Sequence, residues 1–182
     1  MKFSLVISSI IAGIIWISVL QFTNNVFMSS GKLTLKDQAI VRTEALVQVL
    51  NLDLNRIGFG VASNGIIQAD STSITFESDF FNKGTINTIS WQFEKDTENG
   101  SYAAKRLVDS TQTDYMEGIR EFRFGYLNQN MQTTEQVGEI RHIQIFILNE
   151  STSGFNRVSE RHGIYRVISP RNISPVQQED NS

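Results

Sequence analysis

The chain has 182 residues, the length of one ordinary domain, and 40% of them are hydrophobic, which is enough for a packed core. Its net charge is −3 and its basic residues form no stripe that could neutralise several phosphates, so no nucleic acid is expected as a partner. The chain has no cysteine, which excludes disulfides, thiolate catalysis and cysteine-based metal sites.

An uncharged apolar run opens the chain, from Phe3 to Leu20. As a helix this run covers about 27 Å, close to the roughly 30 Å of a bilayer hydrocarbon core. A cleaved signal peptide has a shorter apolar core of about 7–15 residues and a small-x-small cleavage site, and no such site follows Leu20. We therefore expect residues 1–30 to be a retained transmembrane anchor.

The apolar side chains of this run form the expected membrane and assembly segment. They are Phe3, Leu5, Val6, Ile7, Ile10, Ile11, Ile14, Ile15 and Leu20. Basic residues flank the run on both sides, Lys2 before it and Lys32 and Lys36 after it, so charge alone leaves the orientation open. Because the anchor is N-terminal with the rest of the chain behind it, an extracytoplasmic domain is expected.

Helical spacing continues beyond the anchor, over residues 32–57. Polar residues occupy most of the surface, and one expected stripe follows helical spacing. It consists of Leu35, Ala39, Arg42, Leu46, Val49 and Leu50, widened by Ile40, Val47, Leu54 and Ile57. Gly31 predicts a bend or break between the two halves of the helix. Gly58 and Gly60 predict its end, one of them as a left-handed cap.

Beyond Gly60 the pattern alternates with a period of two, which indicates strands. Expected strands cover residues 73–77, 85–93, 102–108, the segment around Phe122 to Tyr126, residues 140–148 and the segment around Tyr165. Asn99-Gly100 predicts a hairpin, and residues 114–118 a turn or short helix. The prediction is an α+β fold in which a long N-terminal transmembrane and amphipathic helix packs on an antiparallel sheet. The globular domain is expected over residues 31–169 and a C-terminal tail over residues 170–182.

No residue pattern points to catalysis, a cofactor or a firm metal site. His142 is expected in an alternating strand and His162 in a turn-like stretch beside Gly163, and nothing places them together. The serines lack a nucleophile-elbow context and a histidine partner. The acidic segment Glu94–Gly100 allows a calcium interpretation, although it matches only fragments of a calcium loop, and a solvated hairpin tip is favoured.

Several short strings, in order along the chain, resemble the type IV pilin and pseudopilin superfamily, and within it PilW-like minor pilins. The start Phe3-Ser4-Leu5-Val6-Ile7 is similar to the start of a mature pilin. Residues 53–60, Asp-Leu-Asn-Arg-Ile-Gly-Phe-Gly, are similar to the close of the pilin helix. Residues 107–109 and 118–126 resemble a strand motif of these proteins, and Pro170-Arg171-Asn172-Ile173 resembles their C-terminal end.

Two positions depart from the family pattern. Lys2 stands where the prepilin peptidase expects glycine, and Ile7 stands where the family has a glutamate that pairs with a neighbour's N-terminal amine. Burying that carboxylate is costly unless it meets its partner, and tip subunits can lack it because no subunit lies above them. A truncated or misassigned start and a degenerate relative are equally compatible with these residues.

The resemblance implies a structural subunit without enzymatic activity. Its expected role is to initiate or cap a short filament of a type IV pilus or a secretion-type system in the bacterial inner membrane. Expected partners are other pilin or pseudopilin subunits, the assembly platform and the membrane. The alternative is a monomeric, membrane-anchored binding module that captures a ligand or peptide on its sheet and has no filament role.

Overall fold

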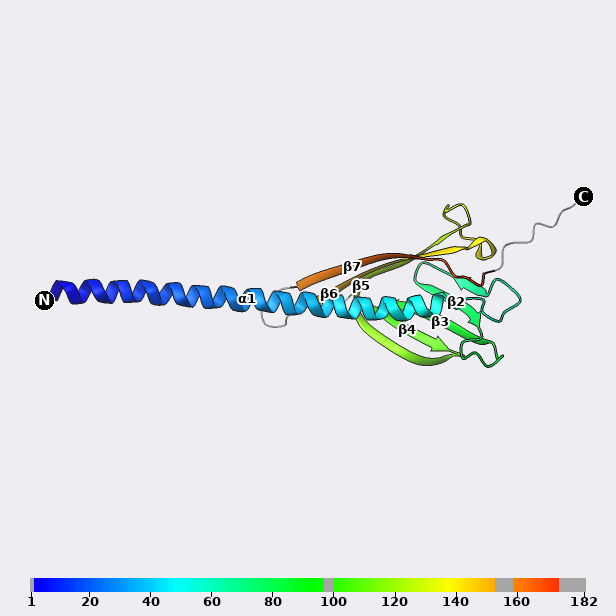
Figure 1. The fold of residues 1–182 in the computed structure, drawn as a ribbon, viewed down its shortest axis with the longest axis horizontal. Helices are drawn as coiled ribbons and strands as arrows, with labels where there is room; N and C mark the ends of the chain where they lie inside the picture. Colours follow the sequence, from blue (N-terminus) through cyan, green and yellow to red (C-terminus); the bar gives the residue numbers. More distant parts are fainter. Residues whose placement is uncertain (1, 97–99, 153–158, 174–182) are drawn as a thin grey trace, which may run out of the picture.

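A computed structural model shows one long helix followed by an antiparallel sheet (Figure 1). It describes residues 2–96, 100–152 and 159–173, with side chains from Val6 onward except at Asp114 and Tyr115. The elements are α1 (Lys2–Leu54), β1 (Ile66–Ala69), β2 (Ser73–Ser78), β3 (Asn87–Lys95), β4 (Tyr102–Val108), β5 (Thr111–Leu127), the 3₁₀ turn η1 (Val137–Glu139), β6 (His142–Thr152) and β7 (Ser159–Ile168).

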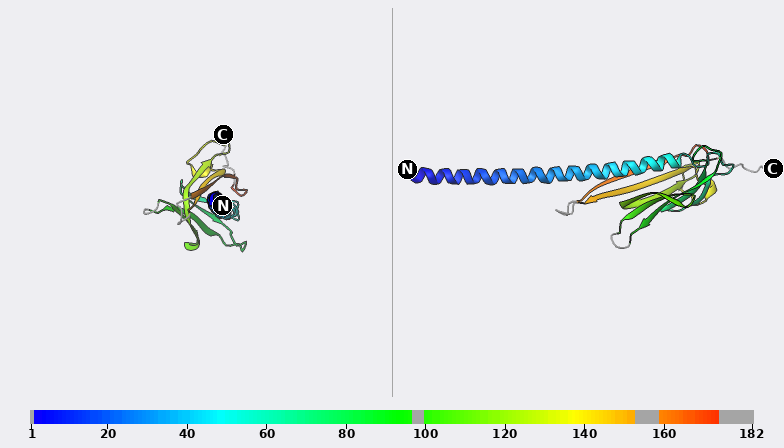
Figure 2. Two further views of the ribbon diagram at one scale, coloured as in Figure 1. Left: turned by 90° about the vertical axis from the view of Figure 1, so that its left-hand side faces the viewer. Right: turned by 90° about the horizontal axis from the view of Figure 1, so that it is seen from below.

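The sheet is a meander in which each strand pairs with the next one along the chain, in the order β1 to β7. Every pairing is antiparallel, and β6 and β7 stay in register from Ile143↔Ile168 to Thr152↔Ser159. The C-terminal half of α1 lies along one face of this sheet, while its N-terminal half extends beyond the domain (Figure 2). The predicted α+β fold class is therefore confirmed.

The helix runs through Gly31 without interruption, so the predicted break there is wrong. A glycine inside a helix costs only about 1 kcal/mol relative to alanine, and hydrogen bonds continue on both sides of it. Hydroxyl groups also bond to carbonyls of the preceding turn, as Ser18 does to Ile14 (2.9 Å) and Thr34 to Ser30 (3.1 Å). These bonds satisfy the polar side chains within the helix itself.

The helix ends at Leu54, three residues before the predicted end. Turns follow to Gly58 and Gly60, which both have the positive φ expected of left-handed glycines (74° and 73°). A Cβ on Gly58 would lie 2.7 Å from the carbonyl oxygen of Asn172. Close backbone approach thus requires glycine where the helix end, β1 and the C-terminal segment meet.

One continuous core lies between the helix and the sheet. From α1 it takes the buried stripe Leu46, Val47, Leu50, Leu54, which Ile57 continues just beyond the helix end. From the sheet it takes the inward positions of each strand, where the alternation places every second side chain on the helix side. Aromatic residues at a period of two are typical of the buried side of a sheet, and this sheet has such a row. The row is buried and consists of Trp91, Phe93, Phe122, Phe124 and Tyr126.

The sheet curls until the β1–β2 turn reaches β5. The Tyr126 hydroxyl lies 2.8 Å from the carbonyl oxygen of Asp70 and 3.1 Å from that of Ser73. The Phe124 N–H also donates to the Ser71 carbonyl (2.8 Å). Burial is the main cause that raises the pKa of Tyr126, which stays protonated as a hydrogen-bond donor.

Residues 114–118 form part of β5, so the predicted turn or short helix there is wrong. The pairs Tyr102↔Ile119 and Ala104↔Met116 leave one extra residue on β5, and Gly118 has a φ of 86°. This is a β-bulge, which bends a strand without ending it. A strand-bending glycine and a turn glycine carry the same local signal, and pairing with β4 decides between them.

One hairpin of the sheet was expected from the sequence, whereas the turn after β4 and the strand β1 were not. The strands β3 and β4 join as predicted around Gly100, but the tip, residues 97–99, lies outside the described residues. A two-residue hairpin turn, Asp109-Ser110, joins β4 to β5 between the paired residues Val108 and Thr111. Both turn residues have positive φ (49° and 68°), which is the signature of a type I′ turn. Strand β1, which sequence reasoning missed, is only four residues long.

The first four residues of the predicted C-terminal tail, 170–173, stay on the domain. Pro170 and Ile173 are buried, and Ile173 belongs to the core. An apolar residue after the last strand gains by packing against the helix end, which the strand pattern alone does not reveal. Residues 174–182 of the predicted tail lie outside the described residues.

Candidate functional site

The N-terminal half of α1 is the largest exposed apolar surface of the described chain. Every described side chain from Val6 to Thr34 is exposed. The predicted segment residues that the structure describes leave 51–59% of their surface exposed, and they are Val6, Ile7, Ile10, Ile11, Ile14, Ile15 and Leu20. Phe3 and Leu5 lie on the same helix, with side chains outside the described part. Monomeric soluble proteins rarely expose an apolar surface of this extent.

This half of the helix is long and apolar enough to cross a membrane. Residues 3–31 contain no charged residue, and as a helix they extend about 43 Å, more than a hydrocarbon core needs. Lys32, Lys36 and Asp37 are the first charges that follow. None of the most apolar stretch is buried in the domain, so its apolar surface requires lipid or other helices.

A buried ion pair holds the other half of α1 on the sheet. Both oxygens of the Asp53 carboxylate accept from Arg106 of β4, at 2.6 Å from Nε and 3.1 Å from Nη2. The indole N–H of Trp91, which is paired with Arg106 across β3 and β4, donates to the same carboxylate at 2.9 Å. Asp53 is 2% exposed and Arg106 9%, so the pair is shielded from water and fixes the helix in one register.

Sequence reasoning missed this pair, although both residues carry a signal. Asp53 falls on the apolar stripe of the helix, three residues after Leu50 and four before Ile57. Arg106 occupies an inward position of an alternating strand, between Ala104 and Val108. A charged residue at a core position indicates a buried partner of opposite charge.

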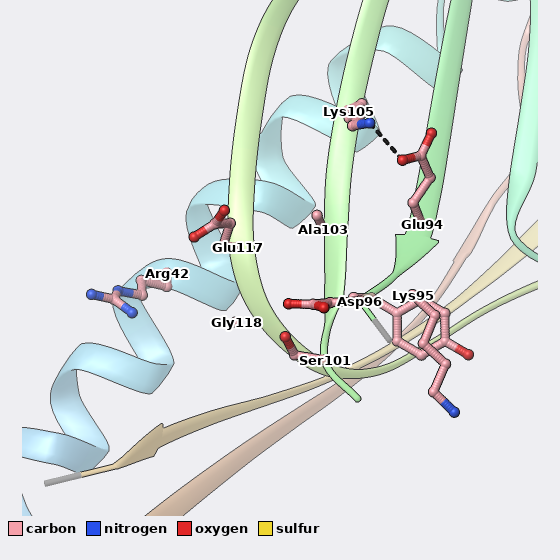
Figure 3. A pocket seen from close by; sticks show the side chains of 10 residues that line it. Arg42, Glu94, Lys95, Asp96, Ser101, Ala103, Lys105, Glu117 and Gly118 are labelled. Carbon is pink, nitrogen blue, oxygen red and sulfur yellow. Dashed lines mark hydrogen bonds and ion pairs between the residues drawn. The ribbon is translucent and has the colours of Figure 1, made fainter. Parts of the chain in front are cut away.

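A cavity of about 420 Å³ lies between α1 and the ends of β3, β4 and β5 (Figure 3). Its walls carry both signs of charge, with Arg42 from the helix, Glu94 and Asp96 from the β3 end and Glu117 from β5. Glu94 forms an ion pair with Lys105 at 2.5 Å. Lys105 thus neutralises one carboxylate of the acidic segment Glu94–Gly100, which is the candidate calcium loop.

The rest of that acidic segment gives calcium little support. Glu98 and Asn99 lie outside the described residues. Within the portions of the chain that the structure does describe, no three His, Cys, Asp or Glu side chains gather closely enough to hold a metal ion. Because residues 97–99 lie outside the described part of the chain, the choice between a calcium loop and a solvated hairpin tip stays a prediction.

The two histidines do not converge, as expected from the sequence. His142 begins β6, and His162 lies in β7 opposite Asn149, seven residues or about 23 Å further along the strand. The prediction that His162 lies in a turn is wrong, because pairing with β6 continues through it. The statement that no serine has a histidine partner is also wrong, since His142 Nδ1 lies 2.7 Å from Ser169 Oγ. This exposed pair has no third group among the described side chains.

The row of β6 side chains that faces the core changes character along its length. Ile143, Ile145 and Ile147 are buried, and Asn149 and Ser151 continue the same row as buried polar residues. Asn149-Glu150-Ser151 has the pattern of an N-glycosylation acceptor, but Asn149 is only 1% exposed, so its side chain is inaccessible in the folded domain.

On the opposite face of β6, Glu150 lies between Arg120 (3.6 Å) and Arg161 (3.3 Å). The Ser159 side chain, followed by Arg161, lowers the pKa of Glu150 through hydrogen bonds to its carboxylate.

Comparison with known proteins adds no relative. No family model matches the chain, and neither a curated protein nor a solved structure matches it.

Proposed function

We propose that the protein is a membrane-anchored structural subunit of the minor pilin or pseudopilin kind, which initiates or caps an envelope filament. The observation that carries this proposal is the division of α1 into two halves. One half is packed on the sheet through a buried stripe, and the other half is apolar on every side and packed on nothing in the domain.

A helix of this kind has two suitable surroundings, lipid and other apolar helices. In lipid, helices associate by close packing of small residues rather than by the hydrophobic effect. Ser8 and Ala12, and Ser9 and Gly13, are small residues four apart on the exposed half. These positions would let a neighbouring helix approach closely, first in the membrane and then in a filament.

Ile7 suits a subunit at the end of a filament. Its side chain is half exposed and carries no charge, so it needs no neighbouring ammonium group when it enters an apolar assembly. A carboxylate at this position would require that partner. A subunit that begins or caps a filament would lack one of the two neighbours along the filament.

The Asp53–Arg106 pair supports a structural rather than a catalytic role. It locks the globular domain to the helix end, so that the position of the helix sets the position of the domain. A subunit whose helix packs in an assembly needs this kind of fixed connection. The extracytoplasmic location of the domain and the absence of enzymatic activity are parts of the same proposal.

Single cysteines test the proposal cleanly, because the chain has none. In membranes of the native host, Ile14→Cys in full-length protein should be protected from a membrane-impermeant maleimide. Thr85→Cys, an exposed loop position of the domain, is the matched control and should be labelled from the extracytoplasmic side. Ile14→Cys should also crosslink to pilin-like subunits, identified by mass spectrometry.

The alternatives give different results in the same experiment. Protection without any crosslinked subunit would support the monomeric binding module instead. Full labelling of Ile14→Cys would contradict both membrane insertion and helix packing. Hydrolase or transferase activity of the purified protein would contradict the structural role.

A further inference from the structure

The end of the domain farthest from the N-terminus carries a groove of about 410 Å³, here called the distal groove. It lies beside the C-terminal end of α1 and the loop between β2 and β3. The groove residues used below are Arg56, Phe59, Phe80, Phe81, Asn82 and Asn172. Phe59 and Phe81 leave 41% and 56% of their surfaces exposed, so the floor offers unpaired apolar area.

The rim of the distal groove is cationic. The Arg56 guanidinium lies 4.9 Å from the centre of the Phe80 ring and donates to the Phe80 carbonyl (2.7 Å). Lys83 Nζ lies 5.7 Å from the centre of the Phe81 ring. The acid of this loop, Asp79, is buried and accepts from the backbone N–H groups of Lys83 (2.8 Å) and Gly84 (2.7 Å). Asp79 also lines the groove, but both of its carboxylate oxygens already accept these backbone hydrogen bonds, so the Arg56 and Lys83 side chains keep their charges for another partner.

We propose that the chain's own C-terminal segment, residues 174–182, binds in the distal groove. Its sequence is Ser-Pro-Val-Gln-Gln-Glu-Asp-Asn-Ser. Pro175 and Val176 supply apolar surface for the phenylalanine rings. Glu179 and Asp180 supply two carboxylates for Arg56 and Lys83, so the segment is complementary to the groove in both respects.

The place where the described chain ends supports this occupant. Ile173 is buried in the core, and Asn172 lines the distal groove. The segment therefore starts beside the groove, and nine residues can span about 30 Å, more than a cavity of this size requires. A tethered segment has a local concentration in the millimolar range, which compensates for the weakness of each exposed ion pair.

Binding of this segment would cover the exposed phenylalanines at the distal end of the domain. A partner with an acidic and apolar stretch of its own would have to displace it. The contact is reversible because its ion pairs are exposed and screened by salt. The inference is independent of the filament role, since it concerns only the domain and its C-terminal segment.

The test is disulfide formation in full-length protein in detergent micelles under mild oxidation. The pair Asn82→Cys with Val176→Cys should crosslink within one chain roughly tenfold faster than a control pair, because binding raises the local concentration of the segment. The control pair is Ser63→Cys with Val176→Cys. Ser63 is exposed, and the carbonyl of the next residue, Asn64, lies beside Gly58 as the Asn172 carbonyl does. It is therefore equally reachable from the end of the described chain.

Charge reversal distinguishes binding of the segment in the distal groove from random encounters of a tethered segment with position 82. Lys83→Glu, which removes a rim charge without touching the Phe80 carbonyl, should lower the crosslinking rate, and Arg56→Glu should lower it further. Adding Glu179→Lys and Asp180→Lys to these variants should restore the rate. Equal rates for the two pairs, or rates that ignore these changes, would overturn the proposal. A crosslinked dimer in place of the intrachain product would overturn it in favour of a second copy.

Discussion

Asp53 near the end of α1 and Arg106 in the middle of β4 form a bidentate buried ion pair, 53 residues apart in the sequence and 2.6 Å apart at their closest atoms. The indole of Trp91 completes the site as a third donor. The pair joins the helix to the inner strands of the sheet, whereas the helix lies mainly along β6 and β7. It thus adds a polar contact to the inner strands beside the continuous apolar core.

Removing one partner of this pair should destabilise the protein strongly. We expect Asp53→Ala or Arg106→Ala to lower the free energy of unfolding by about 3–5 kcal/mol, because each leaves an unpaired buried charge. Replacing both, as in Asp53→Leu with Arg106→Met, should recover most of this loss. Denaturant unfolding of the full-length protein in detergent measures all three. Additive losses in the double variant would show that the two side chains act independently.

The Asp109-Ser110 turn offers a stabilising substitution. Ser110 has a φ of 68°, a left-handed conformation that costs non-glycine residues roughly 1–2 kcal/mol. Ser110→Gly should therefore raise the free energy of unfolding by about 1 kcal/mol after the entropic cost of glycine, and raise the melting temperature by about 2–4 °C.

Asp109→Gly is the matched control in the same turn. Its backbone would be equally relaxed, but it loses the bonds of the Asp109 carboxylate to the Thr88 N–H (2.8 Å) and the Asn87 amide (2.7 Å). It should melt at a lower temperature than Ser110→Gly. A lower melting temperature for Ser110→Gly than for the wild type would contradict the turn assignment.

Stability should fall in acid through Asp109 and Glu150. The Thr88 N–H and then the Asn87 amide hold the pKa of Asp109 below its usual value, and the Ser159 and Arg161 side chains do the same for Glu150. A carboxyl with a lowered pKa contributes stability above its unfolded value, near pH 4, and loses it as the pH falls through the folded pKa.

Melting temperatures measured from pH 7 to pH 3 check this expectation. They should be level from pH 7 to about pH 5 and decline below about pH 4. Asp109→Asn combined with Glu150→Gln should make the decline shallower, since neither side chain then titrates. An unchanged decline in the double variant would assign it to other carboxylates.

Position 7 tests the assembly role. If Ile7 replaces a glutamate that pairs with a neighbouring N-terminal amine, Ile7→Glu should increase incorporation into filaments, measured by crosslinking to major subunits in the native host. Ile10→Glu, one helical turn further on, is the control and should not increase it, because its carboxylate would meet no amine. Equal crosslinking for wild type and Ile7→Glu would count against a docking role for this position.

Patterns that are local along the chain predicted much of the fold correctly. The apolar N-terminal helix, the buried stripe of α1 and most strands depend on the spacing of neighbouring side chains, which follows from helix and strand geometry. The left-handed conformation of Gly58 and the aromatic core row depend on the same kind of local signal. The exposure of residues such as Ile10 and Ile14 was predictable too, because a run that is apolar all round cannot be covered by one small sheet.

Features that depend on contacts between distant residues were not predictable in this way. Gly118 marks a bulge rather than a turn because β5 pairs with β4 on both sides of it. Ile173 is buried because it packs in the core near the end of the helix.

The sequence by itself therefore determined that this protein has an apolar helix, which cannot remain in water. It also determined that the domain behind the helix consists of strands whose apolar and polar side chains alternate. The tertiary structure alone decided how the two are joined, through Asp53 and Arg106. A buried charge pair requires two residues to meet in space, and no spacing along the chain specifies that meeting.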